Sequence, residues 1–204
     1  MAGIQHIAGR AVALERRDVD TDQIIPAAWL KRVERTGFAP GLFGAWRIDP
    51  DFVLNRPGAA QAKVLVAGPN FGCGSSREHA VWALQDFGFQ AVVSPRFADI
   101  FRGNCISSGL VPVEVDEEAV SALFAALAAD PDAEVVVDVA ARTVGIPSAG
   151  LSEPFTISGF AQWRLLEGLD DVALTLRHED AISAYEAIRP SWLPSSVANE
   201  PARS

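Results

Sequence analysis

A glycine-rich stretch contains the residue types of this sequence that are best suited to chemistry. Gly72 and Gly74 flank a cysteine, and Ser75, Ser76 and Arg77 follow directly. Glycines permit positive φ angles and a close approach of the backbone to a ligand. The stretch leads into a predicted helix, whose first N–H groups and dipole favour an anion. Because the guanidinium of Arg77 adds a positive charge with several N–H donors there, we predict a site for a carboxylate or a phosphate.

A purely structural interpretation of the same residues is a helix cap. Ser75 and Glu78 have the spacing of a capping box, in which both side chains bond to backbone N–H groups. Such a cap needs no arginine, since acidic residues suit that end of the helix dipole. The common nucleotide and hydrolase motifs do not fit, because Gly-Lys-Ser/Thr, the third glycine of a dinucleotide fingerprint and Gly-x-Ser-x-Gly are missing here.

The glycine-rich stretch belongs to an alternating series of predicted strands and helices. Short apolar runs predict strands over 62–67, 91–93 and 110–115. Helices are predicted over 75–87, with a stop at Gly88, and over 97–104. This order predicts an α/β core in which the stretch connects a strand to a helix.

The rest of the chain is expected to complete one domain over 1–190, followed by a flexible tail over 191–204. We expect a strand within 4–14, a helix within 27–35, a loop with short helical turns over 43–55, a helix over 117–129, strands of antiparallel character over 135–140, 143–146 and 155–157, and helices over 159–167 and 179–189.

Composition and charge exclude several classes of protein. Hydrophobic residues make up 49% and charged residues 21%, which excludes disordered and collagen-like chains. No long apolar run and no signal-peptide pattern occurs, so we expect a cytoplasmic protein without a membrane partner. The net charge of −9 argues against a nucleic-acid partner. Residues 114–204 hold sixteen acidic and five basic residues, a net charge of −11, so the residues before them sum to +2.

The cysteine count limits what this chain can hold by itself. Cys73 and Cys105 are the two cysteines of the chain. They cannot supply the three or four thiolates of an iron–sulfur cluster or a structural zinc site. We therefore expect no cofactor and no metal on this chain, and a structural role for both thiols.

Long segments in a fixed order resemble one family. Residues 70–80 look like the signature loop of the swivelling domain of the aconitase superfamily, and residues 18–26 resemble the other motif of that domain. The family of bacterial 3-isopropylmalate dehydratase small subunits is similar at 29–38, 42–47, 50–55, 97–101 and 178–182. The resemblance covers about 4–190 and implies a three-layer β/β/α swivelling domain.

The resemblance also implies a hydro-lyase reaction in leucine biosynthesis. In that reaction 2-isopropylmalate loses water to give isopropylmaleate, and water returns at the neighbouring carbon to give 3-isopropylmalate. The family works only with a large subunit that carries a [4Fe–4S] cluster on three cysteines, and the fourth iron binds the substrate hydroxyl and carboxylate. This chain would then complete the site as a lid.

The resemblance assigns roles to individual residues. Ser75 is the implied base that removes the proton next to a carboxylate, and Ser76 and Arg77 are implied to hold a substrate carboxylate. Asp22 is implied to assist proton transfer and Thr21 to contact the substrate. The structural alternative for Asp22 is a cap or turn aspartate. His79 is expected to play a supporting or packing role.

The residues from 29 to 33 fall in the loop that distinguishes substrates in this family. Aconitases place an arginine there for the third carboxylate of citrate, and either Arg32 or Val33 falls at that place. Isopropylmalate carries an isopropyl group instead, so apolar side chains suit it. Trp29, Leu30 and Val33 are the candidates.

Two other functions stay open. A related small subunit would act on citramalate (2-methylmalate) or homoaconitate by the same chemistry. An anion-binding regulatory module would use the glycine-rich stretch without catalysis, but binding alone does not require Asp22.

Overall fold

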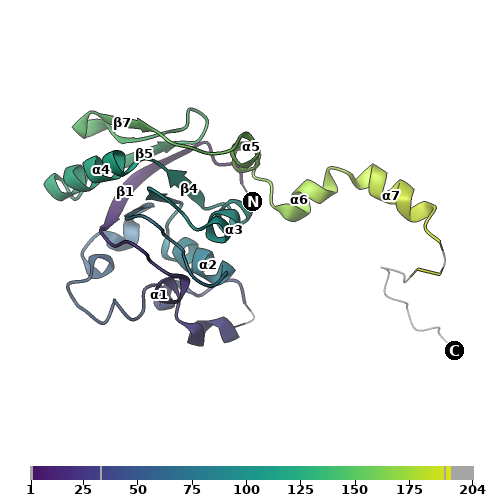
Figure 1. Cartoon of the computed structure of the whole chain (residues 1–204), viewed down its shortest axis with the longest axis horizontal. Helices are drawn as coiled ribbons and strands as arrows, with labels where there is room; N and C mark the ends of the chain where they lie inside the picture. Colours follow the sequence, from purple (N-terminus) through teal and green to yellow (C-terminus); the bar gives the residue numbers. More distant parts are fainter. Residues whose placement is uncertain (1, 33, 191, 194–204) are drawn as a thin grey trace. The chain divides into compact units, whose positions relative to one another are not determined.

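A mixed sheet organises the unit Met1–Asp170, and among the described residues it has seven strands in the order β4-β3-β2-β1-β5-β6-β7 (Figure 1). The structure is a computed structural model that describes residues 2–32, 34–190 and 192–193. The strands are β1 His6–Leu14, β2 Val64–Ala67, β3 Ala91–Ser94, β4 Val111–Glu114, β5 Glu134–Asp138, β6 Thr143–Ile146 and β7 Leu151–Pro154. The helices of this unit are α1 Thr21–Ile24, α2 Glu78–Phe87, α3 Asp99–Ser108, α4 Glu117–Ala129 and α5 Gly159–Glu167.

The long strand β1 belongs to two halves of this sheet. Its last four residues pair in parallel with β2, from Ala11 with Val64 to Leu14 with Ala67. Its first five residues pair antiparallel with β5, from His6 with Asp138 to Arg10 with Glu134. The other pairs continue this division, since β2, β3 and β4 are parallel and β5, β6 and β7 are antiparallel.

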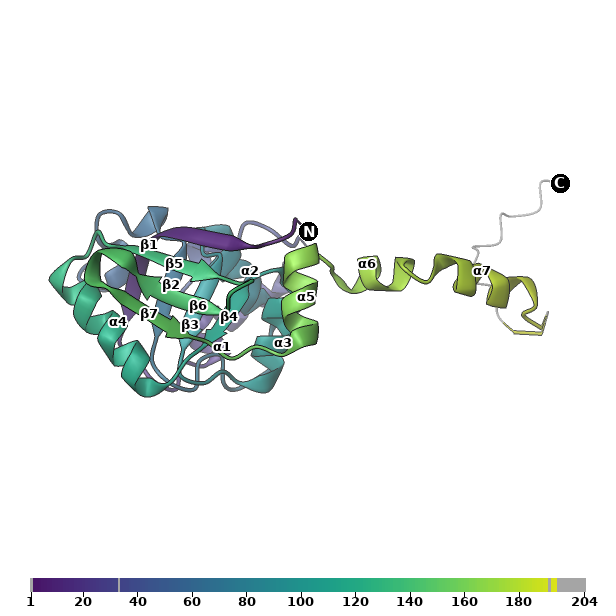
Figure 2. The same ribbon diagram turned by 90° about the horizontal axis from the view of Figure 1, so that it is seen from above.

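Two apolar cores separate three layers. Leu65 and Ala67 of β2 belong to a core that also holds residues of α2 and α3. Val64 and Val66 point to the other face, into a core shared with α4 and the antiparallel strands. Figures 1 and 2 show the antiparallel strands and α4 on one side of the parallel strands, and α2 and α3 on the other. The predicted three-layer α/β fold is therefore confirmed.

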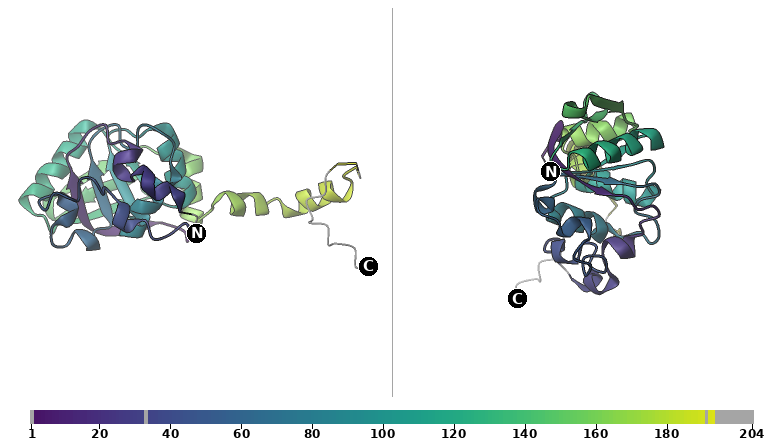
Figure 3. Two further views of the ribbon diagram at one scale, coloured as in Figure 1. Left: turned by 90° about the horizontal axis from the view of Figure 1, so that it is seen from below. Right: turned by 90° about the vertical axis from the view of Figure 1, so that its left-hand side faces the viewer.

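The segment between α1 and β2 is irregular and lies on the helical side of the sheet (Figures 1 and 3). Phe38, Leu42 and Phe43 from this segment are fully buried in the same core as α2. The helix predicted within 27–35 is only a short 3₁₀ helix, Ala27–Lys31. The short helical turns predicted over 43–55 are present.

The start of α2 corrects the capping-box interpretation. The helix begins at Glu78, Arg77 is the N-cap residue with extended backbone angles, and no side chain caps the helix. Ser75 is therefore outside the helix, and Arg77 is not in its first turn. A capping box occurs at α1 instead, where the Asp20 carboxylate accepts from Gln23 N and the Gln23 amide oxygen accepts from Asp20 N.

The last strand also differs from its prediction over 155–157. β7 occupies Leu151–Pro154 and pairs with β6, whereas Thr156 forms an isolated antiparallel bridge with Glu114 at the end of β4. Phe155 N donates to Arg142 O, and Thr156 N donates to Glu114 O. The apolar run that suggested a strand thus joins two strands of the sheet.

The second unit, Asp171–Ser204, contains α6 Asp171–Leu176 and α7 Glu179–Ala187. Neither helix has a buried residue, and α6 is not among the predicted elements. The predicted tail over 191–204 lies outside the described residues, except for 192 and 193. The single domain over 1–190 stays a prediction.

No described helix combines the length and the apolar character that crossing a membrane requires.

Candidate active site

Three loops meet where β1, β2 and β3 end. Gly72 N donates to Val19 O at 2.8 Å, which joins the loop after β2 to the loop after β1. Phe71 N donates to Arg96 O at 3.0 Å, which joins it to the loop after β3. Ligands of α/β sheets bind outside the carboxyl ends of parallel strands. The sheet therefore brings both predicted motifs to the edge where a ligand is expected.

Thr21 connects the motif at 18–26 to the glycine-rich stretch through two hydrogen bonds. Its backbone N–H donates to Cys73 O at 3.0 Å, and its hydroxyl donates to Ser75 O at 2.7 Å. The side chain is buried, with 1% exposed. Because Thr21 holds the backbone of Ser75, this threonine positions the serine in the structure.

Asp22 and Arg77 form an ion pair in which both carboxylate oxygens of Asp22 accept hydrogen bonds from Arg77. Nη2 of Arg77 donates to Oδ2 of Asp22 at 2.8 Å, and Nη1 donates to Oδ1. The Arg77 side chain is 15% exposed and that of Asp22 is 52% exposed. Two parallel hydrogen bonds of this kind fix the plane of the Arg77 guanidinium. Asp22 is therefore neither the cap of α1, which is Asp20, nor a free carboxylate.

Gly72 has to be glycine for two reasons. Its φ is +76°, a region that side chains disfavour. A Cβ built at this position would overlap the ring of Phe101. The ring thus packs directly against the backbone of the loop, which explains why this position accepts no side chain.

A cavity of about 280 Å³ lies in front of the loop. Thr21, Ser75, Ser76 and Arg77 form one side of it, and residues 98–101 at the start of α3 form another. Ser75 and Ser76 are exposed, and among the described contacts neither hydroxyl has a hydrogen bond. Both hydroxyls are therefore available to a ligand in the cavity.

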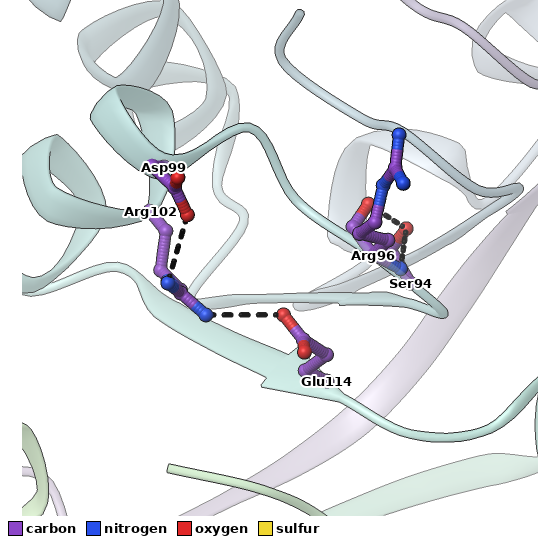
Figure 4. Close-up of polar contacts among 5 residues, drawn as sticks. All are labelled: Ser94, Arg96, Asp99, Arg102 and Glu114. Carbon is purple, nitrogen blue, oxygen red and sulfur yellow. Dashed lines mark hydrogen bonds and ion pairs between the residues drawn. The ribbon is translucent and has the colours of Figure 1, made fainter. Parts of the chain in front are cut away.

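Ile100 and Asp99 are site residues that the sequence reasoning missed. Ile100 is 58% exposed although it is apolar. The Asp99 carboxylate accepts from Nη2 of Arg102 at 2.9 Å, and Arg102 also faces Glu114 (Figure 4). Their place after a predicted strand was the available signal, because residues in such loops reach the same edge of the sheet.

A second polar contact joins these loops through residues that do not line the cavity. Nδ2 of Asn70 donates to Oδ1 of Asp18 at 2.8 Å, and Nη2 of Arg96 approaches the Asn70 amide oxygen at 3.5 Å. The bond from Asn70, together with Arg17 and Arg96, lowers the pKa of Asp18. Asp18 and Asn70 both have positive φ. This pair is a further connection between the two motifs.

The residues expected to distinguish substrates lie elsewhere. Trp29 packs against Phe38, and the Arg32 guanidinium lies 5.4 Å from the Trp29 ring centre and donates to Gly37 O. Neither residue lines the cavity, and nor does Leu30. His79 contacts Phe38 and Trp82 of the same cluster, which is a packing role. Val33 lies outside the described residues.

The two cysteines differ in environment. Cys105 is buried in α3, and burial raises the pKa of its thiol well above the usual value. Burial, followed by Asp20 and Asp18, raises the pKa of Cys73 in the glycine-rich loop. In the part of the chain that is described, no group of three or more His, Cys, Asp or Glu residues has the arrangement of a metal site.

Comparisons with known proteins agree on one family. Residues 1–118 match the family of aconitase C-terminal domains, and residues 171–194 match the C-terminal domain of 3-isopropylmalate dehydratase small subunits. The 3-isopropylmalate dehydratase small subunit of Frankia alni is 63% identical over 93% of this chain and 96% of its own. That of Streptomyces coelicolor is 58% identical over 93% of this chain and 95% of its own.

A solved structure agrees with the sequence matches. The 3-isopropylmalate dehydratase from Methanocaldococcus jannaschii superimposes with a TM-score of 0.66 at 30% identity, covering 89% of this chain and 99% of that chain. With the sequence relatives, this likeness establishes both the fold and the family. The chain therefore belongs to the family of 3-isopropylmalate dehydratase small subunits, within the aconitase superfamily.

Proposed function

We propose that this chain, together with a large subunit, interconverts 2-isopropylmalate and 3-isopropylmalate through isopropylmaleate in leucine biosynthesis. The observation that carries the proposal is the contact of Thr21 with Ser75 and of Asp22 with Arg77 beside one cavity. These contacts bring a hydroxyl, a guanidinium and a carboxylate to the place where a dicarboxylate would bind. Such an enzyme of soluble metabolites works in the cytoplasm.

Ser75 acts as the base in this proposal. Dehydration removes a proton from the carbon next to a carboxylate, so a base must lie within hydrogen-bond reach of that carbon. A serine hydroxyl is weakly acidic, and its alkoxide needs positive groups nearby. Arg77 and the N–H groups between the loop and α2 supply them. Ser75 has no competing hydrogen bond from its hydroxyl among the described contacts.

Arg77 and Ser76 bind a substrate carboxylate, and Asp22 orients Arg77. The fork from Asp22 engages one N–H of each terminal nitrogen, and a guanidinium has five N–H donors. The remaining donors can bind a substrate carboxylate while Asp22 holds the plane.

The iron–sulfur cluster belongs to the large subunit in this proposal. Cys73 and Cys105 cannot hold a cluster, because Cys105 is buried in α3 and Cys73 lies in a separate loop. When bound by the large subunit, the cluster supplies a Lewis acid for the leaving hydroxyl. This chain contributes the base, the carboxylate site and the closure of the cavity.

The cavity favours isopropylmalate over other malates. Ser75–Arg77 give the cavity polar groups, whereas residues 98–101 add the apolar side chains of Ala98, Ile100 and Phe101 beside the Asp99 carboxylate, which is paired with Arg102. In the proposed pose, one carboxylate at an end of the four-carbon backbone reaches Ser76 and Arg77, and the isopropyl branch on an inner carbon lies against Ile100. Citramalate, with a methyl group, would leave part of the Ile100 side chain uncovered, and homoaconitate would place a carboxylate there.

Reconstitution tests the proposal. The chain is mixed anaerobically with its large subunit, and formation of isopropylmaleate is followed by absorbance. We expect no activity from the chain alone and activity from the mixture. Activity of the lone chain, or a mixture that binds the dicarboxylate without turnover, contradicts the proposal. The second result would indicate the anion-binding regulatory module.

A further inference from the structure

Within the described residues of the first unit, one edge of β1 has no pairing strand over the second half of the strand. Pairing with β5 ends at Arg10 with Glu134, whereas residues from Ala11 to Leu14 pair only with β2 on the opposite edge. Backbone groups along a strand point alternately to its two edges. Gln5 O accepts from Val139 N beside β5, and Arg10 O accepts from Lys63 N beside β2. The N–H and C=O groups of Ala11 and Ala13 therefore point to the unpaired edge.

A groove of about 570 Å³ runs along this edge. All residues from Arg10 to Arg16 line it. Phe124 and Leu127 at the end of α4 form one wall, and Phe52 and Val53 form the other. Figure 1 shows the tip of β1 between α4 and this second segment. Small side chains at Ala11 and Ala13 leave the space open.

The charges around the groove suit a polypeptide better than a small anion. Arg10, Arg16 and Arg56 line it, but so do Glu15, Asp49 and Asp51. Arg10 is also engaged at one end, because its guanidinium pairs with Asp132 at 2.8 Å. Apolar walls, mixed charges and unpaired backbone groups together fit an extended chain of about four residues at roughly 3.3 Å each.

We propose that the groove accepts an extended segment of the large subunit, which pairs with Ala11 and Ala13 as an added strand. Strand addition satisfies the exposed backbone groups and lets alternate side chains fill pockets. The segment would place an apolar side chain against Phe124 and Leu127. This proposal rests on the proposed function, because it takes the large subunit as the partner.

The shape of the groove disfavours pairing of β1 with β1 of a second copy of this chain. β1 lies at the bottom of a groove between two walls, so two such strands cannot pair edge to edge without their walls colliding. The partner segment must therefore be a single extended strand with no helix or sheet packed on either of its faces. Its position also matters for the site, since Arg16 is followed within two residues by Asp18 of the site loop. An added strand would hold the start of that loop.

Hydrogen exchange at single-residue resolution tests the proposal. The chain alone is compared with the active complex that it forms with the large subunit. We expect the Ala11 and Ala13 amides to exchange at least about tenfold more slowly in the complex, while Gly9, which pairs with β5, is protected in both samples. An active complex in which both amides exchange as fast as in the lone chain overturns the groove proposal and leaves the proposed function intact. Failure to form any complex contradicts both.

A pair of variants supplies an independent readout. Ala13→Pro removes the N–H that faces the groove but no bond to β2, so the sheet is expected to form. Ala13→Ser keeps the N–H and nearly the same volume. We expect Ala13→Pro to raise the Kd for the large subunit about tenfold, and Ala13→Ser to leave it unchanged. Equal Kd values for the two folded variants, or protection of the lone chain that rises with its concentration, contradict the proposal.

Discussion

At the scale of single residues, the hydroxyl of Ser75 is the group on which the proposed chemistry depends. Ser75→Ala should lower kcat of the reconstituted enzyme by about 10²–10⁴-fold, the usual contribution of a general base. Substrate binding should change little, because Arg77 and Ser76 remain. Turnover and substrate Kd are measured on the same preparation. Ser121→Ala on α4 is the control, since that hydroxyl donates to Glu117 O and has no other hydrogen bond within the described part of the chain. Turnover of Ser75→Ala within tenfold of the native enzyme would contradict the assignment.

Ile100 carries the prediction for substrate preference. Ile100→Ala removes an exposed apolar side chain from the cavity without opening the core. The ratio of kcat/KM for isopropylmalate to that for citramalate should fall about tenfold, because only the larger substituent reaches this side chain. Val172→Ala on α6 is a control of similar exposure outside the cavity. An unchanged ratio in Ile100→Ala would show that other residues select the substrate.

The candidate residues were only partly predictable from the sequence. Thr21, Asp22 and Ser75–Arg77 lie together because the loops that carry them follow neighbouring parallel strands, and their roles stay predictions. Trp29 and Arg32 do not line the cavity, since stacking with Phe38 and the bond to Gly37 O hold them in an aromatic cluster. No local pattern reveals that choice. Whether they approach a bound substrate stays a prediction.

At the scale of elements, the glycine-rich loop depends on close packing with α3. Gly72→Ala should lower the free energy of unfolding by about 2–4 kcal/mol, because the methyl group would overlap Phe101 and the φ of +76° disfavours a side chain. Urea unfolding measures the loss. Gly103→Ala is the matched control, since a Cβ there has no neighbour within 4 Å and alanine favours the helix by about 0.5–1 kcal/mol. Equal stability of the two variants would contradict the packing argument.

The elements themselves were largely predictable where periodicity was strong. α4 and α5 occupy the predicted ranges, and the strands β2, β3 and β4 lie within or next to theirs. The capping box predicted at Ser75 was wrong because residues distant in sequence determine where the helix begins. The Thr21 hydroxyl donates to the Ser75 carbonyl, and Asp22 binds the Arg77 guanidinium, so both residues lie outside the helix. A pattern four residues long contains no information about contacts that span more than fifty residues.

At the scale of the whole molecule, both apolar cores lie within the first unit. The buried residues of the two cores end at Leu165, and among the described residues Leu169 is the last buried apolar residue. A chain that ends after Asp170 should therefore unfold with a free energy within about 1 kcal/mol of the full chain. Urea unfolding of both chains checks this. A loss greater than about 3 kcal/mol would show that the second unit contributes to folding of the first.

The pairing of β1 has a consequence for how the protein is made. β1 leaves the ribosome before the other strands of this sheet, but Ala11 pairs with Val64 and His6 pairs with Asp138. Its first half therefore stays unpaired until most of the chain has been synthesised. Contacts between residues so far apart in sequence slow folding and expose apolar strands to aggregation. The two edges of this central strand are therefore completed at different times, and β1 stays open to aggregation until β2 and then β5 have been made.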